Sequence, residues 1–281
     1  MDINTELQEK VYKLFEEGRI ERFIGYEKGS LPYKTKPCII RKKEDVRRLI
    51  FNQFCVNNLS IYLRGSPMKT GILANTCTLR SITMLIQQKQ VNPENLFVIA
   101  VNCAGMADKE GNILDKCKTC NHELPKIYNE LIGEEITVSC KPGDEYNFIT
   151  ELEKLPVERR WEFWNKEFEK CVRCYACRNI CPVCFCRECV ADKTITQWVS
   201  KLNQSSTNEF YNLMRIMHVL GRCTDCGECE RVCPVKIPFR KILKKMEKEI
   251  REKYGYIPGR DPSEAPPLTT FKEGDPEEGI K

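Results

Sequence analysis

The segment Cys171-Val-Arg-Cys174-Tyr-Ala-Cys177-Arg-Asn-Ile-Cys181-Pro182 returns later in the chain as Cys223-Thr-Asp-Cys226-Gly-Glu-Cys229-Glu-Arg-Val-Cys233-Pro234. Both segments follow the C-x₂-C-x₂-C-x₃-C-P spacing that holds a [4Fe–4S] cluster, with the first three thiolates in one short loop. A zinc site would use two cysteine pairs separated by a longer gap, and disulfides or scattered cysteines would not repeat this spacing. The two segments, which we name motif 1 and motif 2, therefore predict two [4Fe–4S] clusters.

The fourth cysteine of each motif is expected to bind the cluster of the other motif, because it is carried away from the loop formed by the first three. This crossed ligation defines two predicted ligand sets. Set 1 contains Cys171, Cys174, Cys177 and Cys233, and set 2 contains Cys223, Cys226, Cys229 and Cys181.

The residues around both motifs have helical spacing. Between the motifs, Ser206-Thr-Asn-Glu209 has the form of a capping box, and Gly221 follows as a stop signal. Apolar side chains recur at helical intervals at Trp161, Trp164, Phe168, Phe210, Leu213, Met214, Met217, Phe239, Leu243, Met246, Ile250 and Tyr254. We interpret these stripes as packing surfaces and predict an α-helical two-cluster ferredoxin domain over residues 151–254.

The N-terminal half has an α/β pattern. Residues 71–75 and 96–101 have the composition of buried strands, and residues 79–88 between them have that of an amphipathic helix. Such a βαβ unit has parallel strands and a right-handed crossover. We therefore predict an N-terminal helix over residues 1–30 and an α/β module with a small parallel sheet over residues 31–150.

Four more cysteines are expected to meet at one edge of this sheet. Cys77 follows the first strand and Cys103 the second, at the carboxyl ends where open α/β sheets bind ligands. Cys117 and Cys120 follow from a glycine-containing loop. These four form set 3, which predicts a third [4Fe–4S] cluster. The alternatives are buried thiols with an unrelated C-x₂-C pair, or a zinc site.

A fourth set is suggested by the remaining cysteines. Cys184, Cys186 and Cys189 follow motif 1 directly, and Cys55 lies far upstream. Together they form set 4, a possible fourth cluster that would join the two modules. Inert buried thiols explain the same spacing equally well. Cys38 and Cys140 have no companions, and we interpret them as ordinary residues.

Length and composition are typical of a cytoplasmic protein. The chain has 281 residues, of which 41% are hydrophobic, and its 18 cysteines favour metal sites over disulfides in the cytosol. It has no apolar run of about eighteen residues and no signal-peptide pattern, so we expect a cytoplasmic location without membrane insertion. The formal charge of +5 does not indicate nucleic-acid binding, because each cluster with four thiolates adds about −2.

The motifs also carry a family resemblance. The runs from Cys171 to Cys189 and from His218 to Pro234 resemble iron–sulfur electron-transfer subunits related to the β subunit of deazaflavin-reducing hydrogenase and formate dehydrogenase. The two-cluster module resembles that of heterodisulfide-reductase-type proteins. The similarity covers most of residues 30–281. It implies the third and fourth clusters, because cysteines in such relatives stand at the positions matching Cys55, Cys77, Cys103, Cys117, Cys120, Cys184, Cys186 and Cys189.

The resemblance implies FAD in the N-terminal module, although the sequence departs from the family there. Relatives have Gly-Cys-Asp where this chain has Thr76-Cys77-Thr78, and Pro-Cys where it has Asn102-Cys103. No G-x-G-x-x-G follows either predicted strand, so the residues themselves give no flavin signal.

The sequence thus predicts a redox subunit of a cytoplasmic anaerobic oxidoreductase complex. No catalytic acid/base pair or triad is visible, so the subunit would carry single electrons between a partner's flavin or cluster and a catalytic subunit. The expected partners are a flavoprotein of the heterodisulfide-reductase type and the catalytic subunit of a hydrogenase or formate dehydrogenase. The alternatives are an FAD-containing oxidoreductase subunit that couples hydride transfer to one-electron transfer, and a zinc-stabilised binding module.

The final segment, residues 255–281, is rich in proline and glycine and poor in apolar residues. Composition alone would leave it disordered. Leu268, Phe271 and Ile280 are spaced among the prolines as anchors would be, and proline reduces the entropy that is lost on docking. We therefore predict an extended docking tail along the surface of this protein or of a partner.

Overall fold

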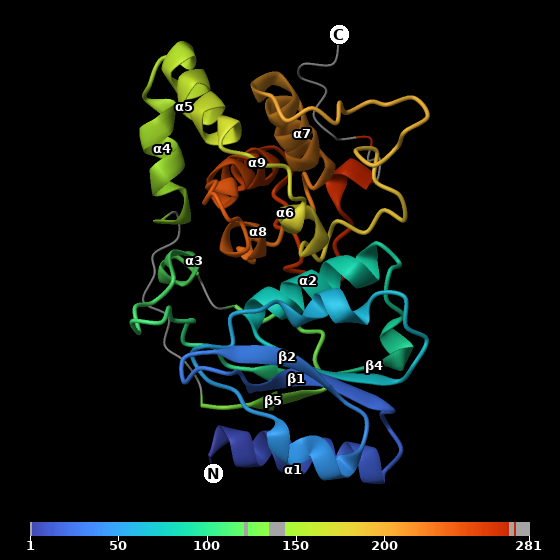
Figure 1. The fold of residues 1–281 in the computed structure, drawn as a ribbon. Helices are drawn as coiled ribbons and strands as arrows, with labels where there is room; N and C mark the ends of the chain where they lie inside the picture. The colour runs from blue at the N-terminus through green and yellow to red at the C-terminus, as the bar shows by residue number, and fades with distance from the viewer. Residues whose placement is uncertain (1, 121–122, 135–143, 270–272, 274–281) are drawn as a thin grey trace. The chain divides into compact units, whose positions relative to one another are not determined.

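The computed structural model describes the whole chain except residues 1, 121–122, 135–143, 270–272 and 274–281. The chain forms two compact units (Figure 1). Unit 1 contains residues 1–142 and 259–264, and unit 2 contains residues 143–258 and 265–281.

Unit 1 is built on a five-stranded sheet with the order β2-β1-β3-β4-β5. The strands are β1 (Arg22–Lys28), β2 (Thr35–Ile40), β3 (Thr70–Ala74), β4 (Leu96–Val101) and β5 (Glu130–Ile132). β3 pairs in parallel with β1 and β4, and β4 pairs in parallel with β5, whereas β1 and β2 are antiparallel. The sheet is therefore mixed and not purely parallel as we expected. The connection between β1 and β2 is too short for a crossover, so these two strands pair as a hairpin.

Helix α2 (Thr76–Gln87) stands between β3 and β4 in the chain. It begins before the predicted residue 79 because the Asn75 side chain caps it, accepting a hydrogen bond from the Thr78 N–H at 3.1 Å. Cys77 therefore lies in the first turn of α2, and Cys103 lies just after β4. Because β3 and β4 are neighbours and parallel, both cysteines stand at the carboxyl edge of the sheet.

Helix α1 (Ile3–Glu16) covers the face of the sheet opposite to α2 (Figure 1). It buries Leu7, Val11 and Leu14 at helical spacing. The helix is shorter than the segment 1–30 that we assigned to it, because the chain turns at Gly18, with φ of +64°, and then enters β1. The shorter helices of unit 1 are η1 (Lys43–Arg48), η2 (Leu59–Leu63), η3 (Pro93–Asn95) and α3 (Asp115–Lys118).

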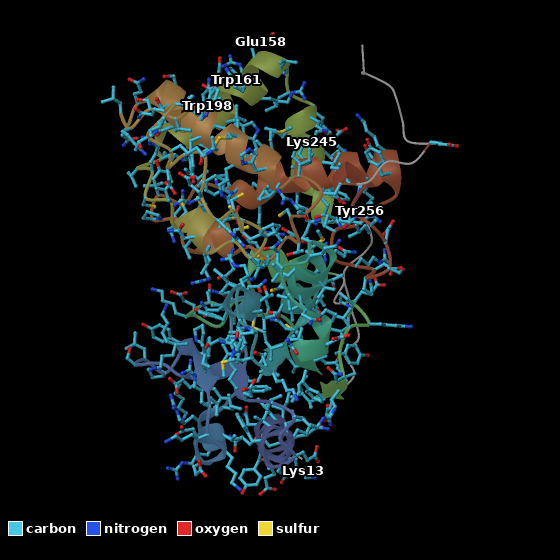
Figure 2. All side chains as sticks on the ribbon, turned by 90° about the vertical axis from the view of Figure 1, so that its right-hand side faces the viewer. Lys13, Glu158, Trp161, Trp198, Lys245 and Tyr256 are labelled. Atoms are coloured by element: carbon cyan, nitrogen blue, oxygen red, sulfur yellow. The ribbon has the colours of Figure 1, made fainter. Side chains whose placement is uncertain are left out.

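The described residues of unit 2 form helices and loops, with no strand among them. The helices are η4 (Asp144–Tyr146), α4 (Asn147–Glu153), α5 (Val157–Glu169), α6 (Ala176–Asn179), α7 (Ser205–His218), α8 (Glu228–Arg231), α9 (Phe239–Tyr254) and η5 (Pro267–Thr269). Trp164 and Phe168 of α5 are buried, as expected for a packing stripe. Trp161 is on the same predicted stripe but stays 45% exposed, and Trp198 is also exposed (Figure 2).

Helix α7 connects the two motifs and differs from the prediction at its start. It begins at Ser205, so Ser206 lies inside the first turn and the capping box does not form. Its end at His218 agrees with the predicted stop, because Gly221 follows with φ of +68°. Within the described part of the chain, no helix combines the length and the apolar character needed to cross a bilayer.

Residues 259–264 of the predicted tail belong to unit 1 and contact α2. Gln87 Nε2 donates to the carbonyl oxygen of Asp261 at 3.0 Å and to that of Glu264 at 2.5 Å. A helix side chain thus holds backbone groups of this part of the tail. Phe271 and Ile280, two of the three predicted anchors, lie outside the described residues.

Candidate iron–sulfur centres

The two motifs share a backbone conformation as well as a spacing. In motif 1, Arg173 and Tyr175 have φ of +49° and +59°, and at the matching positions of motif 2 Asp225 and Gly227 have φ of +55° and +74°. These left-handed residues stand on either side of the second cysteine and reverse the chain direction, which lets three thiols share one loop. A one-turn helix then carries the third cysteine, α6 in motif 1 and α8 in motif 2.

The cysteines of set 1 come together in the structure. Burial raises the pKa of the Cys177 thiol, and the Arg215 guanidinium lowers it in part. Cys171, Cys233 and Cys174 raise the same pKa further. Groups that influence one another in this way are near neighbours. Cys233 of motif 2 therefore lies with the three thiols of motif 1, which is the arrangement that crossed ligation requires.

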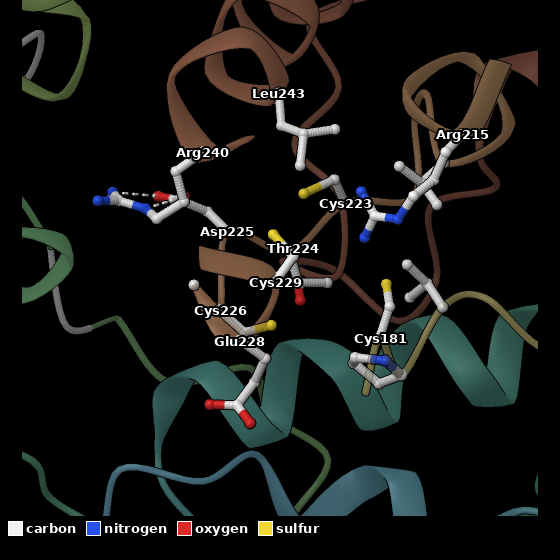
Figure 3. Close-up of a pocket in the computed structure, with 14 residues that line it drawn as sticks. Cys181, Arg215, Cys223, Thr224, Asp225, Cys226, Glu228, Cys229, Arg240 and Leu243 are labelled. Carbon is white, nitrogen blue, oxygen red and sulfur yellow. Dashed lines mark hydrogen bonds and ion pairs between the residues drawn. The ribbon is translucent and has the colours of Figure 1, made fainter. Parts of the chain in front are cut away.

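The cysteines of set 2 line one pocket (Figure 3). Cys181 reaches this pocket from motif 1, and Cys223, Cys226 and Cys229 reach it from motif 2. Burial raises the pKa of Cys229 to about 12, with Arg215 opposing and Cys181 adding to the rise. The two motifs thus exchange their fourth cysteines in both directions.

Hydrogen bonds to sulfur suit these thiols to iron–sulfur clusters. The backbone N–H of Arg173 donates to Cys171 Sγ and that of Ile237 donates to Cys233 Sγ, each at 3.4 Å. Such bonds favour the thiolate, which is the form that binds iron, and they help to set the reduction potential of a cluster. The donor set and its hydrogen bonds therefore fit a [4Fe–4S] cube.

A single metal ion fits these cysteines less well. Among the described residues, no three histidine, cysteine or carboxylate side chains converge on a position for one ion. A zinc site needs such convergence, because all four ligands bind the same atom. A [4Fe–4S] cube instead offers one iron to each of four thiolates, so its ligands stand farther apart.

The cysteines of set 3 also come together, within unit 1. Burial raises the pKa of Cys103 to about 12, and the thiols of Cys77, Cys117 and Cys120 contribute to the rise. Cys117 Sγ accepts a hydrogen bond from the Met106 N–H at 3.3 Å. The edge of the sheet thus gathers four thiols and an N–H···S bond, as set 1 does.

Set 4 is divided between the two units. Cys184, Cys186 and Cys189 are neighbours in unit 2, since burial raises the pKa of Cys184 to about 11 and the other two thiols add to it. Cys55 is fully buried in unit 1, and burial raises its pKa to about 11 as well. Because the set draws on both units, it stays a prediction.

Two charged residues near the cysteines were not singled out by the motifs. Arg215 of α7 is 3% exposed and lines the pocket of set 2. Arg215 lies one turn after the buried Tyr211. The sequence could have pointed to it as a cation on the buried face of a predicted helix. Asp225, between two cysteines of motif 2, binds Arg240 through two hydrogen bonds at 2.5 and 3.0 Å.

Cys38 is expected to react very slowly with alkylating reagents. Burial raises the pKa of its thiol from the ordinary value of 9.0 to about 12, and only the thiolate is nucleophilic. At pH 8 the thiolate population falls on the order of a thousandfold relative to an ordinary thiol, and reactivity returns only as the pH approaches about 12. Iodoacetamide labelling of the native protein, read by peptide mass spectrometry, checks this. Rapid labelling of Cys38 at pH 8 would show that the thiol is not buried as described.

Comparisons with known proteins agree with an iron–sulfur role for these cysteines. A family model described as a 4Fe-4S dicluster domain matches residues 167–237, which contain both motifs. The β subunit of F420-dependent formate dehydrogenase from Methanocaldococcus jannaschii is 39% identical over 107 residues, which are 38% of this chain and 27% of that protein. The β subunit of F420-dependent formate dehydrogenase 1 from Methanococcus maripaludis is 23% identical over an alignment of 356 positions that covers 90% of each chain. The chain contains a 4Fe–4S dicluster domain and is similar to these β subunits.

The chain thus spans about a quarter of the first relative's length and most of the second's. The dicluster domain and the many cysteines indicate that it carries multiple [4Fe–4S] clusters. Among solved structures, the xenon-derivatised F420-reducing [NiFe] hydrogenase complex from Methanosarcina barkeri matches with a TM-score of 0.31 and 20% identity, over 37% of this chain and 39% of that one. That likeness is too low to indicate a shared fold.

Proposed function

We propose that this iron–sulfur protein is a redox subunit that relays single electrons between a partner's flavin or cluster and a catalytic subunit. The exchange of fourth cysteines carries the proposal, because each ligand set then contains cysteines of both motifs and the two sets lie close together. Cys177 of set 1 also acts on the pKa of Cys229 in set 2, so the two sets are neighbours. Adjacent one-electron centres with no catalytic side chain beside them are what a relay requires.

In this proposal each of sets 1 to 4 holds one [4Fe–4S] cube. When bound, a cube supplies a site that takes up and releases one electron. The chain's own residues hold the thiols in place, donate N–H groups to sulfur and exclude water. Cys177, Cys229 and Cys233 are each less than a tenth exposed, so part of set 1 and part of set 2 are shielded from solvent.

The proposed partners follow from the relatives. Both are β subunits of formate dehydrogenases, so we propose the catalytic subunit of a formate dehydrogenase or hydrogenase on one side of the relay. A heterodisulfide-reductase-type flavoprotein is proposed on the other side. The tail after residue 255 would assist assembly by docking on this protein or on such a partner.

Anaerobic mixing tests the relay. The chain is captured with its partners from anaerobic cells, reduced with dithionite, freed of excess reductant and mixed with the oxidised catalytic subunit that co-purifies with it. We expect the visible absorbance of oxidised clusters to return in the parent and in a Cys38→Ser control. The proposal fails if the reduced clusters keep their electrons in the presence of an excess of this oxidised partner.

Iron content tests the number of clusters. We expect about sixteen irons per anaerobically purified chain if all four sets hold cubes, at four irons per cube. A value of about twelve would leave set 4 as buried thiols, and about eight in a fully occupied sample would remove sets 3 and 4 from the proposal. The same sample shows whether flavin is bound. Cys38→Ser should leave the iron content unchanged, because Cys38 belongs to no set.

A further inference from the structure

The guanidinium of Arg215 is buried with only part of its hydrogen-bonding capacity used. The side chain is 3% exposed. Nη2 donates to the carbonyl oxygen of Cys177 at 2.9 Å. Nε and Nη1 are buried and find no hydrogen-bond partner among the described residues. Burying a donor without a partner is costly, and more so when the group is charged, so these two donors call for an acceptor.

Arg215 faces cysteines of both sets. Figure 3 shows its side chain entering the pocket of set 2 between Cys223 and Cys181. Its Nη2 bonds to the carbonyl oxygen of Cys177 in set 1, and its side chain lines the pocket that the four cysteines of set 2 share. The guanidinium therefore lies at the junction of set 1 and set 2.

The charge of Arg215 has no carboxylate to balance it. No aspartate or glutamate of the described residues lies within ion-pair distance of its guanidinium, and its other close neighbour is the ring of Phe239, at 5.3 Å from the centroid. Arg240 and Lys244, two cations near motif 2, differ in this respect. Arg240 pairs with Asp225, and Lys244 pairs with Asp225 and Glu247.

An unbalanced buried cation is costly, because it has lost its hydration and gained no opposite charge. Neutral thiols cannot supply that charge. A cube with four thiolates carries about −2 and presents sulfur acceptors, so clusters in sets 1 and 2 would satisfy both the charge and the two free donors of Arg215.

We propose that Arg215 is a positioning residue shared by the clusters of sets 1 and 2, and that its charge raises the reduction potential of both. The inference rests on the proposed function, because it needs clusters in these sets. Reduction adds one negative charge to a cluster, and a fixed cation in a water-free site favours the more negative state. Because both clusters would face the same cation, their potentials would shift in the same direction.

Redox titration of the full chain, followed by electron paramagnetic resonance, tests the proposal. We expect Arg215→Met to lower the ratio of reduced to oxidised cluster at a fixed potential by at least about tenfold for both signals, which is 59 mV for a one-electron couple. Arg215→Lys keeps the charge and should stay within about threefold of the parent. The matched control is Arg222→Met, which removes a more exposed arginine beside motif 2 and should change the ratio by less than about twofold.

Each outcome decides for or against the role of Arg215. Unchanged potentials in Arg215→Met, or equal shifts in Arg222→Met, would overturn it. If Arg215→Met loses iron, Arg215→Lys becomes the decisive variant. Retained iron with near-parental potentials would support the role of the positive charge, and an equal loss of iron would reject that role. Iron content and spectra of the parent protein test the clusters separately, so failure of the proposed function is distinguishable from failure of this inference.

Discussion

Replacing Cys233 by serine is expected to remove the cluster that we propose for Cys171, Cys174 and Cys177, although Cys233 belongs to motif 2. The structure places Cys233 beside these three thiols, and serine does not supply the soft thiolate that iron–sulfur clusters select. The expected loss is one cube, about four irons per chain. Iron analysis and low-temperature electron paramagnetic resonance of the dithionite-reduced variant measure it.

The reciprocal variant is the control for crossed ligation. Cys181→Ser should remove the cluster of Cys223, Cys226 and Cys229 and leave the other signal in place. Two reference variants assign the signals. Cys174→Ser removes a ligand from the same cluster as Cys233→Ser, and Cys226→Ser removes one from the same cluster as Cys181→Ser. Cys233→Ser resembling Cys226→Ser would show that each motif keeps its own four cysteines, and crossed ligation would be wrong.

Asp225→Ala is expected to destabilise unit 2 by about 3–5 kcal/mol. Asp225 has a side-chain exposure of 13% and pairs with Arg240, at 13%, and Lys244, at 9%. Removing the carboxylate leaves two poorly hydrated cations with one fewer partner, which costs far more than loss of an exposed pair. Alanine also accepts the φ of +55° poorly.

Two further variants separate the charge from the backbone. Asparagine keeps the shape of the side chain and tolerates positive φ. Asp225→Asn should therefore show most of the destabilisation of Asp225→Ala, through loss of the charge alone. Glu162→Gln removes the exposed partner of Arg159, at 2.8 Å, and should cost no more than about 1 kcal/mol. Denaturant titration of the full chain follows tryptophan fluorescence, because all three tryptophans lie in unit 2. Equal midpoints for Asp225→Asn and Glu162→Gln would contradict a buried charge network.

The motifs were predictable because cluster binding is encoded locally. Three cysteines within one short loop need only a fixed spacing and permissive residues between them, and both are visible in the sequence. The strands β3 and β4 were predictable for a similar reason: each is a short apolar run. The grouping of Cys77, Cys103, Cys117 and Cys120 then followed from where parallel strands end.

Features that depend on distant partners were not predictable in the same way. β1 contains Gly25 and three charged residues, so its strand character comes from pairing with β2 and β3 and not from an apolar pattern. The sequence also did not show what Arg215 faces. That depends on how α7 packs against both motifs, and helical spacing alone reports only which face is buried.

The left-handed residues of the motif loops have a consequence for the protein in air. Arg173, Tyr175 and Asp225 hold a conformation that costs about 1–2 kcal/mol for a residue with a side chain. Bound iron would keep the loops in that conformation, because metal binding and local folding are linked. Once oxidation destroys a cluster, the same three residues favour relaxation of the loop and separation of the thiols. Exposure to oxygen is therefore expected to unfold these loops as well as to destroy the clusters.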